Sequence, residues 1–115
     1  MRLCGADNIN QQDPTPCFIR LTRKNGPTVK ISGFKYRSQS ERLIDQEVIK
    51  TLGCEKEVSK SKKQVGTPWE PCESYGTISL TFDEVDAEGK LLERHDKKRK
   101  FFVCKNLPDA RIYIK

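Results

Sequence analysis

Five cysteines are the residues of this sequence with the greatest capacity for chemistry. They stand at positions 4, 17, 54, 72 and 104 of 115 residues. None of them belongs to a Cys-x-x-Cys pair, the spacing typical of zinc ribbons and thioredoxin-like redox sites. Widely spaced cysteines in a small domain are instead typical of structural disulfides formed in an oxidising compartment. The sequence therefore predicts a secreted, disulfide-stabilised protein without a metal site.

Two disulfide bonds are predicted from the cysteine positions. A Cys54–Cys72 bond would close a loop of about 18 residues and would stabilise the fold by about 3 kcal/mol in the chain-entropy description. A Cys17–Cys104 bond would tie the first predicted strand to a later one. The alternative is a Cys4–Cys17 bond, with Cys104 buried and reduced. Because the number of cysteines is odd, one thiol is left over, and it could join two chains into a disulfide-linked dimer.

Basic residues are the second chemical feature of the chain. Lys and Arg number 22 against 16 Asp and Glu, so the formal net charge is +6, which favours anionic partners. The predicted anion-binding residues are four consecutive cations: Lys97, Lys98, Arg99 and Lys100. Such a block can hold phosphate or sulfate groups, and it also fits heparin binding or a nuclear address. The alternative interpretation is a solvated turn, because charges of both signs are mixed along most of the chain.

The segment between Cys54 and Cys72 shows no periodicity, and we interpret it as a long loop. A bond between its ends would restrain it and would present lysines beside a tryptophan, a side chain favoured at protein interfaces. The predicted partner-binding residues are Lys60, Lys62, Lys63 and Trp69. In the alternative interpretation, Trp69 folds back between Pro68 and Pro71, whose spacing also matches a weak SH3-ligand pattern.

Catalytic groups are scarce in this sequence. General acid–base chemistry at neutral pH most often uses histidine, and His95 is the only one. It stands in the charged run 94–98, which we interpret as a solvated turn. The sequence therefore predicts that the protein is not an enzyme and uses no cofactor. Chemistry between a cysteine and His95 is the remaining alternative.

Hydrophobic patterns predict the strands that position these groups. Residues 17–23 and 28–32 alternate in polarity on either side of Asn25-Gly26, the strongest short signal of a β-hairpin. Further strands are predicted at residues 75–85, 91–92, 101–104 and 111–115. Residues 94–100 are expected to form a basic turn between two of them.

One amphipathic helix is predicted at about residues 39–52. Its apolar stripe recurs at helical spacing and consists of Leu43, Ile44, Val48, Ile49 and Leu52. Ser38 and Glu41 match a capping box at its start. Gly53 stands where a left-handed C-cap is wanted.

These elements favour an α+β fold, with one helix docked on an antiparallel sheet of about five to six strands. The alternative is a β-sandwich with the helix in a crossover connection. Residues 1–16 are predicted to form an irregular N-terminal arm, and residues 17–115 a single globular domain. No apolar run approaches the roughly 18 residues that a membrane helix needs.

The predicted function is that of a secreted, non-enzymatic module that docks on a protein partner, as an inhibitor or an immune or host-directed effector. Affinity for sulfated glycans is an additional expectation from the basic block. Residues 1–5 lack the apolar core of a signal peptide, so we interpret the chain as a mature fragment with an added start Met. The alternative function is an intracellular, nuclear or nucleic-acid-associated basic protein with reduced cysteines.

Overall fold

A computed structural model describes residues 14–22, 26–67, 70–107 and 110–115. The elements, in chain order, are β2 (Thr15–Thr22), β3 (Thr28–Lys35), β4 (Arg42–Asp45), α1 (Gln46–Leu52), a 3-10 turn η2 (Glu55–Glu57), β5 (Ser59–Val65), β6 (Cys72–Val85), β7 (Leu91–Cys104) and β8 (Ile112–Ile114). None of the helices found in these ranges is long and apolar enough to cross a membrane.

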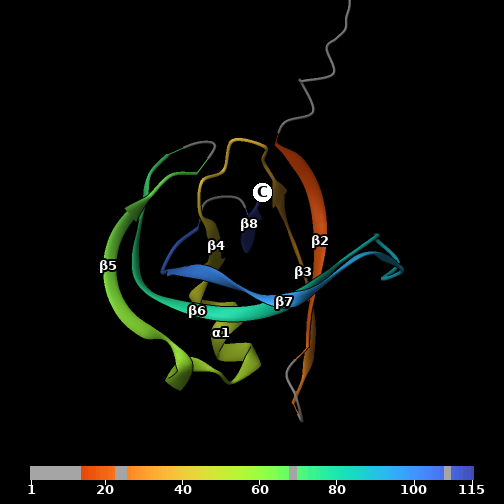
Figure 1. The fold of residues 1–115 in the computed structure, drawn as a ribbon, viewed down its shortest axis with the longest axis horizontal. Helices are drawn as coiled ribbons and strands as arrows, with labels where there is room; N and C mark the ends of the chain where they lie inside the picture. Colours follow the sequence, from red (N-terminus) through yellow and green to blue (C-terminus); the bar gives the residue numbers. More distant parts are fainter. Residues whose placement is uncertain (1–13, 23–25, 68–69, 108–109) are drawn as a thin grey trace, which may run out of the picture.

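Six strands close into a β-barrel, drawn in Figure 1. Their order is β2-β3-β8-β4-β7-β6, and β6 pairs back onto β2. Two of the pairings, β3 with β8 and β4 with β7, are parallel. Strands β6 and β7 are the longest, and their hairpin extends past β2 and β3 (Figure 1). In the described part of the chain, β5 pairs only with β6 and stands outside the closed ring.

The barrel shows that the α+β prediction is wrong, and the sandwich alternative with it. The chain is mostly strand, with one short helix. The hairpin predicted around Asn25-Gly26 is confirmed in its strands, since Thr22 pairs with Thr28, although Asn25 itself lies outside the described residues. Closure removes the exposed edges that an open sheet of these strands would carry.

The helix is much shorter than predicted. It begins at Gln46 rather than near residue 39, because residues 42–45 form β4 between β7 and β8. As a strand, this segment buries both of its faces: Ile44 inside the barrel and Leu43 outside it. A helix could not place Leu43 and Ile44 on opposite sides of a sheet, so pairing on both edges overrides the local pattern.

The helix ends also differ in part from the prediction. The capping box at Ser38 and Glu41 is wrong, since both residues precede β4. Asp45 is the N-cap, and its carboxylate accepts a hydrogen bond from the Glu47 amide at 3.0 Å. The predicted C-cap is confirmed: Gly53 has φ 70° and its amide donates to carbonyls of the last turn.

Two apolar clusters stabilise the barrel. The inner core fills its interior and includes Ile19, Leu21, Ile44, Ile78, Leu80, Phe82, Phe101, Val103, Ile112 and Ile114. Val48, Ile49 and Leu52 of α1 and the following Cys54 belong to the same cluster. The second cluster, here called the outer cluster, comprises Leu43, Val65, Phe102, Cys104 and Tyr113. Phe102 lies between Phe101 and Val103, so alternation along β7 divides the two clusters.

Two segments predicted to be irregular are strands. Residues 94–100, expected to form a basic turn, lie within β7, which runs unbroken from Leu91 to Cys104. The Cys54–Cys72 segment contains η2 and β5, so it is not a long loop. Six of the seven residues of β5 are exposed, and a strand that buries so little leaves hardly any apolar signal in the sequence.

Candidate anion-binding site at the barrel mouth

Basic residues gather at the end of the barrel opposite α1. Arg42 begins β4, while α1 follows the other end of that strand. Lys35 ends β3, and Lys115 follows β8. Because β3 runs parallel to β8 and β8 antiparallel to β4, these three positions fall at the same end. We call this end the basic mouth; its residues are Lys35, Arg37, Arg42, Arg99, Lys100 and Lys115.

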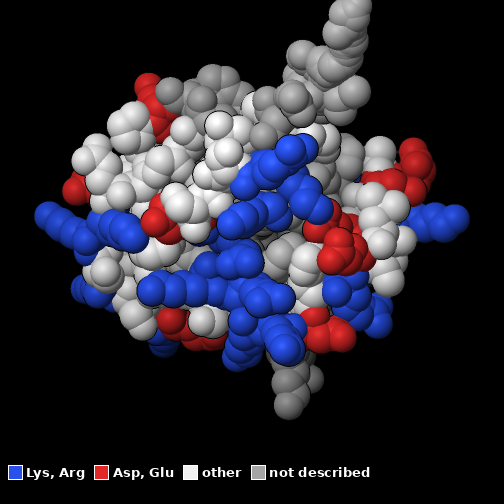
Figure 2. Space-filling view, turned by 45° about the horizontal axis from the view of Figure 1, so that its top comes forward, with Lys and Arg blue, Asp and Glu red and all other residues white. Residues whose placement is uncertain are grey.

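The basic mouth is visible as a band of Lys and Arg side chains in Figure 2, which brings the top of Figure 1 forward. Acidic side chains border this band. Lys35, Arg37 and Lys115 line a depression of about 300 Å³ together with Thr15. Concave basic surfaces concentrate positive potential and attract anions.

Two arginines of the mouth, Arg42 and Arg99, lie near each other on the same side of the sheet. Arg42 pairs with Phe101 across the parallel strands β4 and β7, and Arg99 lies two residues before Phe101, on the same side of the sheet. Burial and then the charge of Arg99 lower the pKa of Arg42. Within the described ranges, neither guanidinium has a carboxylate partner. The Nε atom of Arg99 is also buried, and it makes no hydrogen bond to any residue that the structure describes.

Two lysines extend the mouth over the outer cluster. The amino groups of Lys63 and Lys100 lie 5.0 and 5.1 Å from the centre of the Phe102 ring. Lys63 also pairs with Glu41 at 3.1 Å. Lys100 has no carboxylate partner among the residues that the structure describes. Two cations on one ring repel each other, so this part of the surface also favours an added anion.

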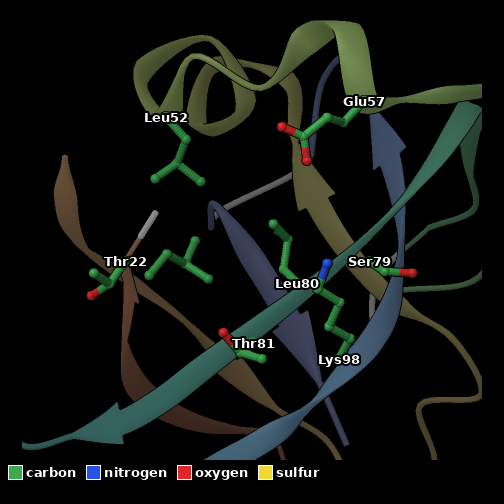
Figure 3. Close-up of a pocket in the computed structure, with 8 residues that line it drawn as sticks. Thr22, Leu52, Glu57, Ser79, Leu80, Thr81 and Lys98 are labelled. Carbon is green, nitrogen blue, oxygen red and sulfur yellow. The ribbon is translucent and has the colours of Figure 1, made fainter. Parts of the chain in front are cut away.

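The predicted block of four cations is divided by the strand that carries it. Arg99 pairs with Leu80 on the side that faces the inner core, whereas Lys100 lies over Phe102 on the outer side. Lys98 lines a separate pocket of about 420 Å³. Figure 3 shows Leu52 from α1 and Leu80 from β6 directed into that pocket. The four residues therefore do not form one compact site, although Arg99 and Lys100 both belong to the basic mouth.

The predicted partner-binding residues lie on and after β5. Lys60, Lys62 and Lys63 are exposed on this strand. Trp69 lies outside the described residues. Of the three lysines, Lys63 approaches the basic mouth, through its contact with Phe102. Sequence reasoning missed Arg42, Lys35, Arg37 and Lys115, because the chain closure that brings them together leaves no local signal.

His95 is not the solvated turn residue that we expected. It lies on β7 with its ring stacked on Phe82, at 4.3 Å between centroids and 19° between planes. Its Nε2 is 2.9 Å from a carboxylate oxygen of Glu84, and Lys35 Nζ donates to both oxygens of that carboxylate at 3.1 and 3.2 Å. Glu84, Glu93 and His95 could together supply three ligands to a cation, but Lys35 already satisfies Glu84.

None of the four described cysteines forms a disulfide bond, and the predicted pairs are not brought together. Cys54 belongs to the inner core, while Cys72 packs on the outer cluster. Cys17 packs on the inner core and Cys104 belongs to the outer cluster, so the barrel wall separates this pair as well. Cys4 lies outside the described residues.

The thiol of Cys17 lies near Glu84, the carboxylate that contacts His95. Burial, and then the charge of Glu84, raise its pKa to about 11. A thiol with this pKa is protonated at neutral pH and is a weak nucleophile. The arrangement therefore gives no support to catalysis by Cys17 and His95.

Comparison with known proteins found no match for this chain. The chain matches no family model, and it has no significant similarity to a curated protein or to a solved structure.

Proposed function

We propose that the protein is a non-enzymatic binding module that holds a sulfated glycan at the basic mouth. The observation that carries this proposal is the Arg42–Arg99 pair, two like charges on the same side of the sheet with no carboxylate partner among the residues that the structure describes. A sulfate group placed between the two guanidinium groups would replace this repulsion with charge-assisted hydrogen bonds. It could also accept the buried Nε–H of Arg99, which has no partner within the described ranges.

A sulfated chain fits this surface better than a nucleic acid. Proteins that bind single-stranded nucleic acids usually stack the bases on accessible aromatic rings. Each described Phe and Tyr is buried or half-buried, and Phe102 is covered by two lysines. The surface thus offers cations but little aromatic area for a base. The predicted secretion of the protein is compatible with an extracellular glycan and remains a prediction.

Heparin binding tests the proposal most directly. We expect the double variant Arg42→Gln/Arg99→Gln to bind heparin oligosaccharide at least about 10-fold more weakly, with a salt-dependence slope smaller by about 2, since each lost contact removes about one unit. The matched control is Lys50→Gln/Lys105→Gln, which removes two charges from the opposite end. We expect this control to change the affinity by less than about 2-fold. If both double variants lost the same heparin affinity, binding would depend on net charge and not on the basic mouth.

A parallel titration distinguishes the glycan from a nucleic acid. A single-stranded oligonucleotide with the same number of charges as the heparin fragment would be measured at the same salt concentration. We expect the heparin fragment to bind more tightly. If the oligonucleotide binds more tightly, and the Arg42→Gln/Arg99→Gln variant loses this binding, the ligand of the basic mouth is a nucleic acid and not a glycan.

The unpaired edge of β5 supports a second candidate function, the docking of a protein partner. In the described part of the chain this edge has no neighbouring strand, and it carries Lys60, Lys62 and Lys63. An acidic extended segment could add to it as a further strand, with backbone hydrogen bonds and lysine–carboxylate pairs. Lysines on an edge strand also prevent unwanted sheet pairing, so their presence alone does not establish docking.

Strand addition at β5 has its own test. Lys62→Pro would remove an amide and distort the edge, while Lys62→Gln would remove only the charge. A partner that docks by strand addition should lose affinity at least about 10-fold with proline and only about 2-fold with glutamine. Similar losses with both substitutions would indicate simple charge attraction instead.

A further inference from the structure

The barrel brings together two cysteines that were not predicted to pair. Cys72 begins β6 and Cys104 ends β7, two neighbouring antiparallel strands. Ser74 lies directly opposite Cys104, so Cys72 is diagonal to Cys104 on the same face. The thiol of Cys72 donates to the carbonyl of Asn106 at 3.2 Å, which places it beyond the end of β7 and next to Cys104.

Their side chains also share one environment. Cys104 belongs to the outer cluster, and Cys72 packs against it. The two thiols lie within hydrogen-bonding reach of each other. Cys104 is fully buried, whereas Cys72 is half-buried. An external reagent therefore reaches Cys72 first.

We propose that Cys72 and Cys104 form an intramolecular disulfide bond when the folded protein meets a disulfide oxidant such as oxidised glutathione. The thiolate of Cys72 attacks one glutathione sulfur, forming a mixed disulfide and releasing the first glutathione thiol. The thiolate of Cys104 then attacks the Cys72 sulfur and releases the second. Two S–H bonds are lost, one S–S bond is formed, and two electrons and two protons pass to the oxidant.

This pairing differs from both predicted bonds because the barrel wall separates their partners. Cys17 and Cys54 pack with the inner core, on the other side of the sheet from Cys72 and Cys104. Burial raises the pKa of Cys104 to about 12, with smaller contributions from Cys72, so exchange should be slow at neutral pH and faster at pH 9. The bond would fasten the open ends of the long β6–β7 hairpin, which carries His95 and Arg99.

Non-reducing peptide mapping of the folded full chain tests the proposal. After incubation with oxidised glutathione and alkylation of the remaining thiols, we expect one linked peptide pair that contains Cys72 and Cys104. The buried Cys54 should become alkylated only after denaturation. A lasting glutathione adduct on Cys72, or a link between any other two cysteines, would overturn the proposal.

Substitutions and melting curves give a second measurement. We expect reduction of the oxidised protein to lower Tm by about 10 °C, because it opens the loop that the bond closes between Cys72 and Cys104. Cys72→Ser should abolish both the linked peptide and the Tm difference, while Cys17→Ser and Cys4→Ser should retain them. An unchanged Tm difference in Cys72→Ser would overturn the pairing. Because the heparin test runs on reduced protein, the two proposals can fail independently.

Discussion

Arg42 and Arg99 lie on the adjacent parallel strands β4 and β7, on the same side of the sheet. Burial, followed by the charge of Arg99, makes the protonated state of Arg42 less favourable and lowers its pKa. Two other cations near this end are neutralised, since Lys35 pairs with Glu84 and Lys63 with Glu41. Residues that reduce stability without local compensation are characteristic of binding sites. This contrast supports an anionic ligand for the two arginines.

The first prediction is that Arg99→Met stabilises the protein while it weakens heparin binding. The substitution removes a buried N–H without a described partner and relieves repulsion on Arg42. We expect an increase in the free energy of unfolding of about 1 kcal/mol. Arg111→Met is the control, since Arg111 pairs with Asp45 at 3.2 Å and its loss should destabilise the fold. Denaturant unfolding of both variants measures the effect. If Arg99→Met lowers the free energy of unfolding, Arg99 does not destabilise the free protein and the prediction is wrong.

The second prediction concerns alkaline pH. In the folded chain, burial and the charge of Glu84 raise the pKa of Cys17 from its ordinary value of 9.0 to about 11. Between pH 9 and 11, the unfolded chain therefore releases a proton that the folded chain keeps. The stabilising contribution of this thiol is fully present below pH 9 and is lost as the pH rises toward 11.

The Cys17→Ala variant isolates this contribution. Lysines and tyrosines also titrate above pH 9, so the useful quantity is the difference between the parent and the variant. We expect the stability of the reduced parent protein to fall more steeply than that of Cys17→Ala in urea unfolding from pH 8 to pH 11. Parallel curves would show that the Cys17 thiol has the same pKa in the folded and unfolded chains.

Local signals in the sequence predict local features of this fold. The Asn25-Gly26 turn signal predicts the β2–β3 hairpin, and Gly53 predicts the C-cap, because each acts through a few neighbouring residues. The inward positions Ile112 and Ile114 also follow from simple alternation, and both are buried. These features need no knowledge of distant partners.

Barrel closure could not be predicted in the same way. The segment that contains Leu43 and Ile44 has helical periodicity and becomes a strand only because β7 and β8 pair with its two edges. The polar residues of β7 show no apolar periodicity. They form a strand because they pair with β6, and β7 accommodates extra residues between His95 and Arg99 as a bulge. The basic mouth depends on both of these non-local pairings. The charge excess therefore predicts an anionic partner in general, but not the residues that meet it.

The third prediction is that Asp45→Ala destabilises the protein more than an ordinary loss of a helix cap. The carboxylate is buried and accepts hydrogen bonds from the amides of Glu47 and Leu107, and it pairs with Arg111. We expect a loss of about 2–4 kcal/mol, since three donors would lose their acceptor. Thermal unfolding checks this value. Thr51→Ala, which removes one exposed hydroxyl bond to Glu47, should cost less than about 1 kcal/mol.

The fourth prediction tests the parallel contact between β3 and β8, one of the pairings of the barrel wall. A Cβ on Gly33 would collide with the side chain and the carbonyl oxygen of Ile112, and the backbone atom cannot move without breaking the sheet. We therefore expect Gly33→Ala to lower the free energy of unfolding by about 1–3 kcal/mol. Gly66→Ala is the matched control, because a Cβ there meets no atom and the backbone needs no positive φ. In denaturant unfolding the control should keep the stability of the parent. Equal stability of the two variants would mean that β3 and β8 are not packed together at Gly33, and the closed barrel would then have to be abandoned for a more open sheet.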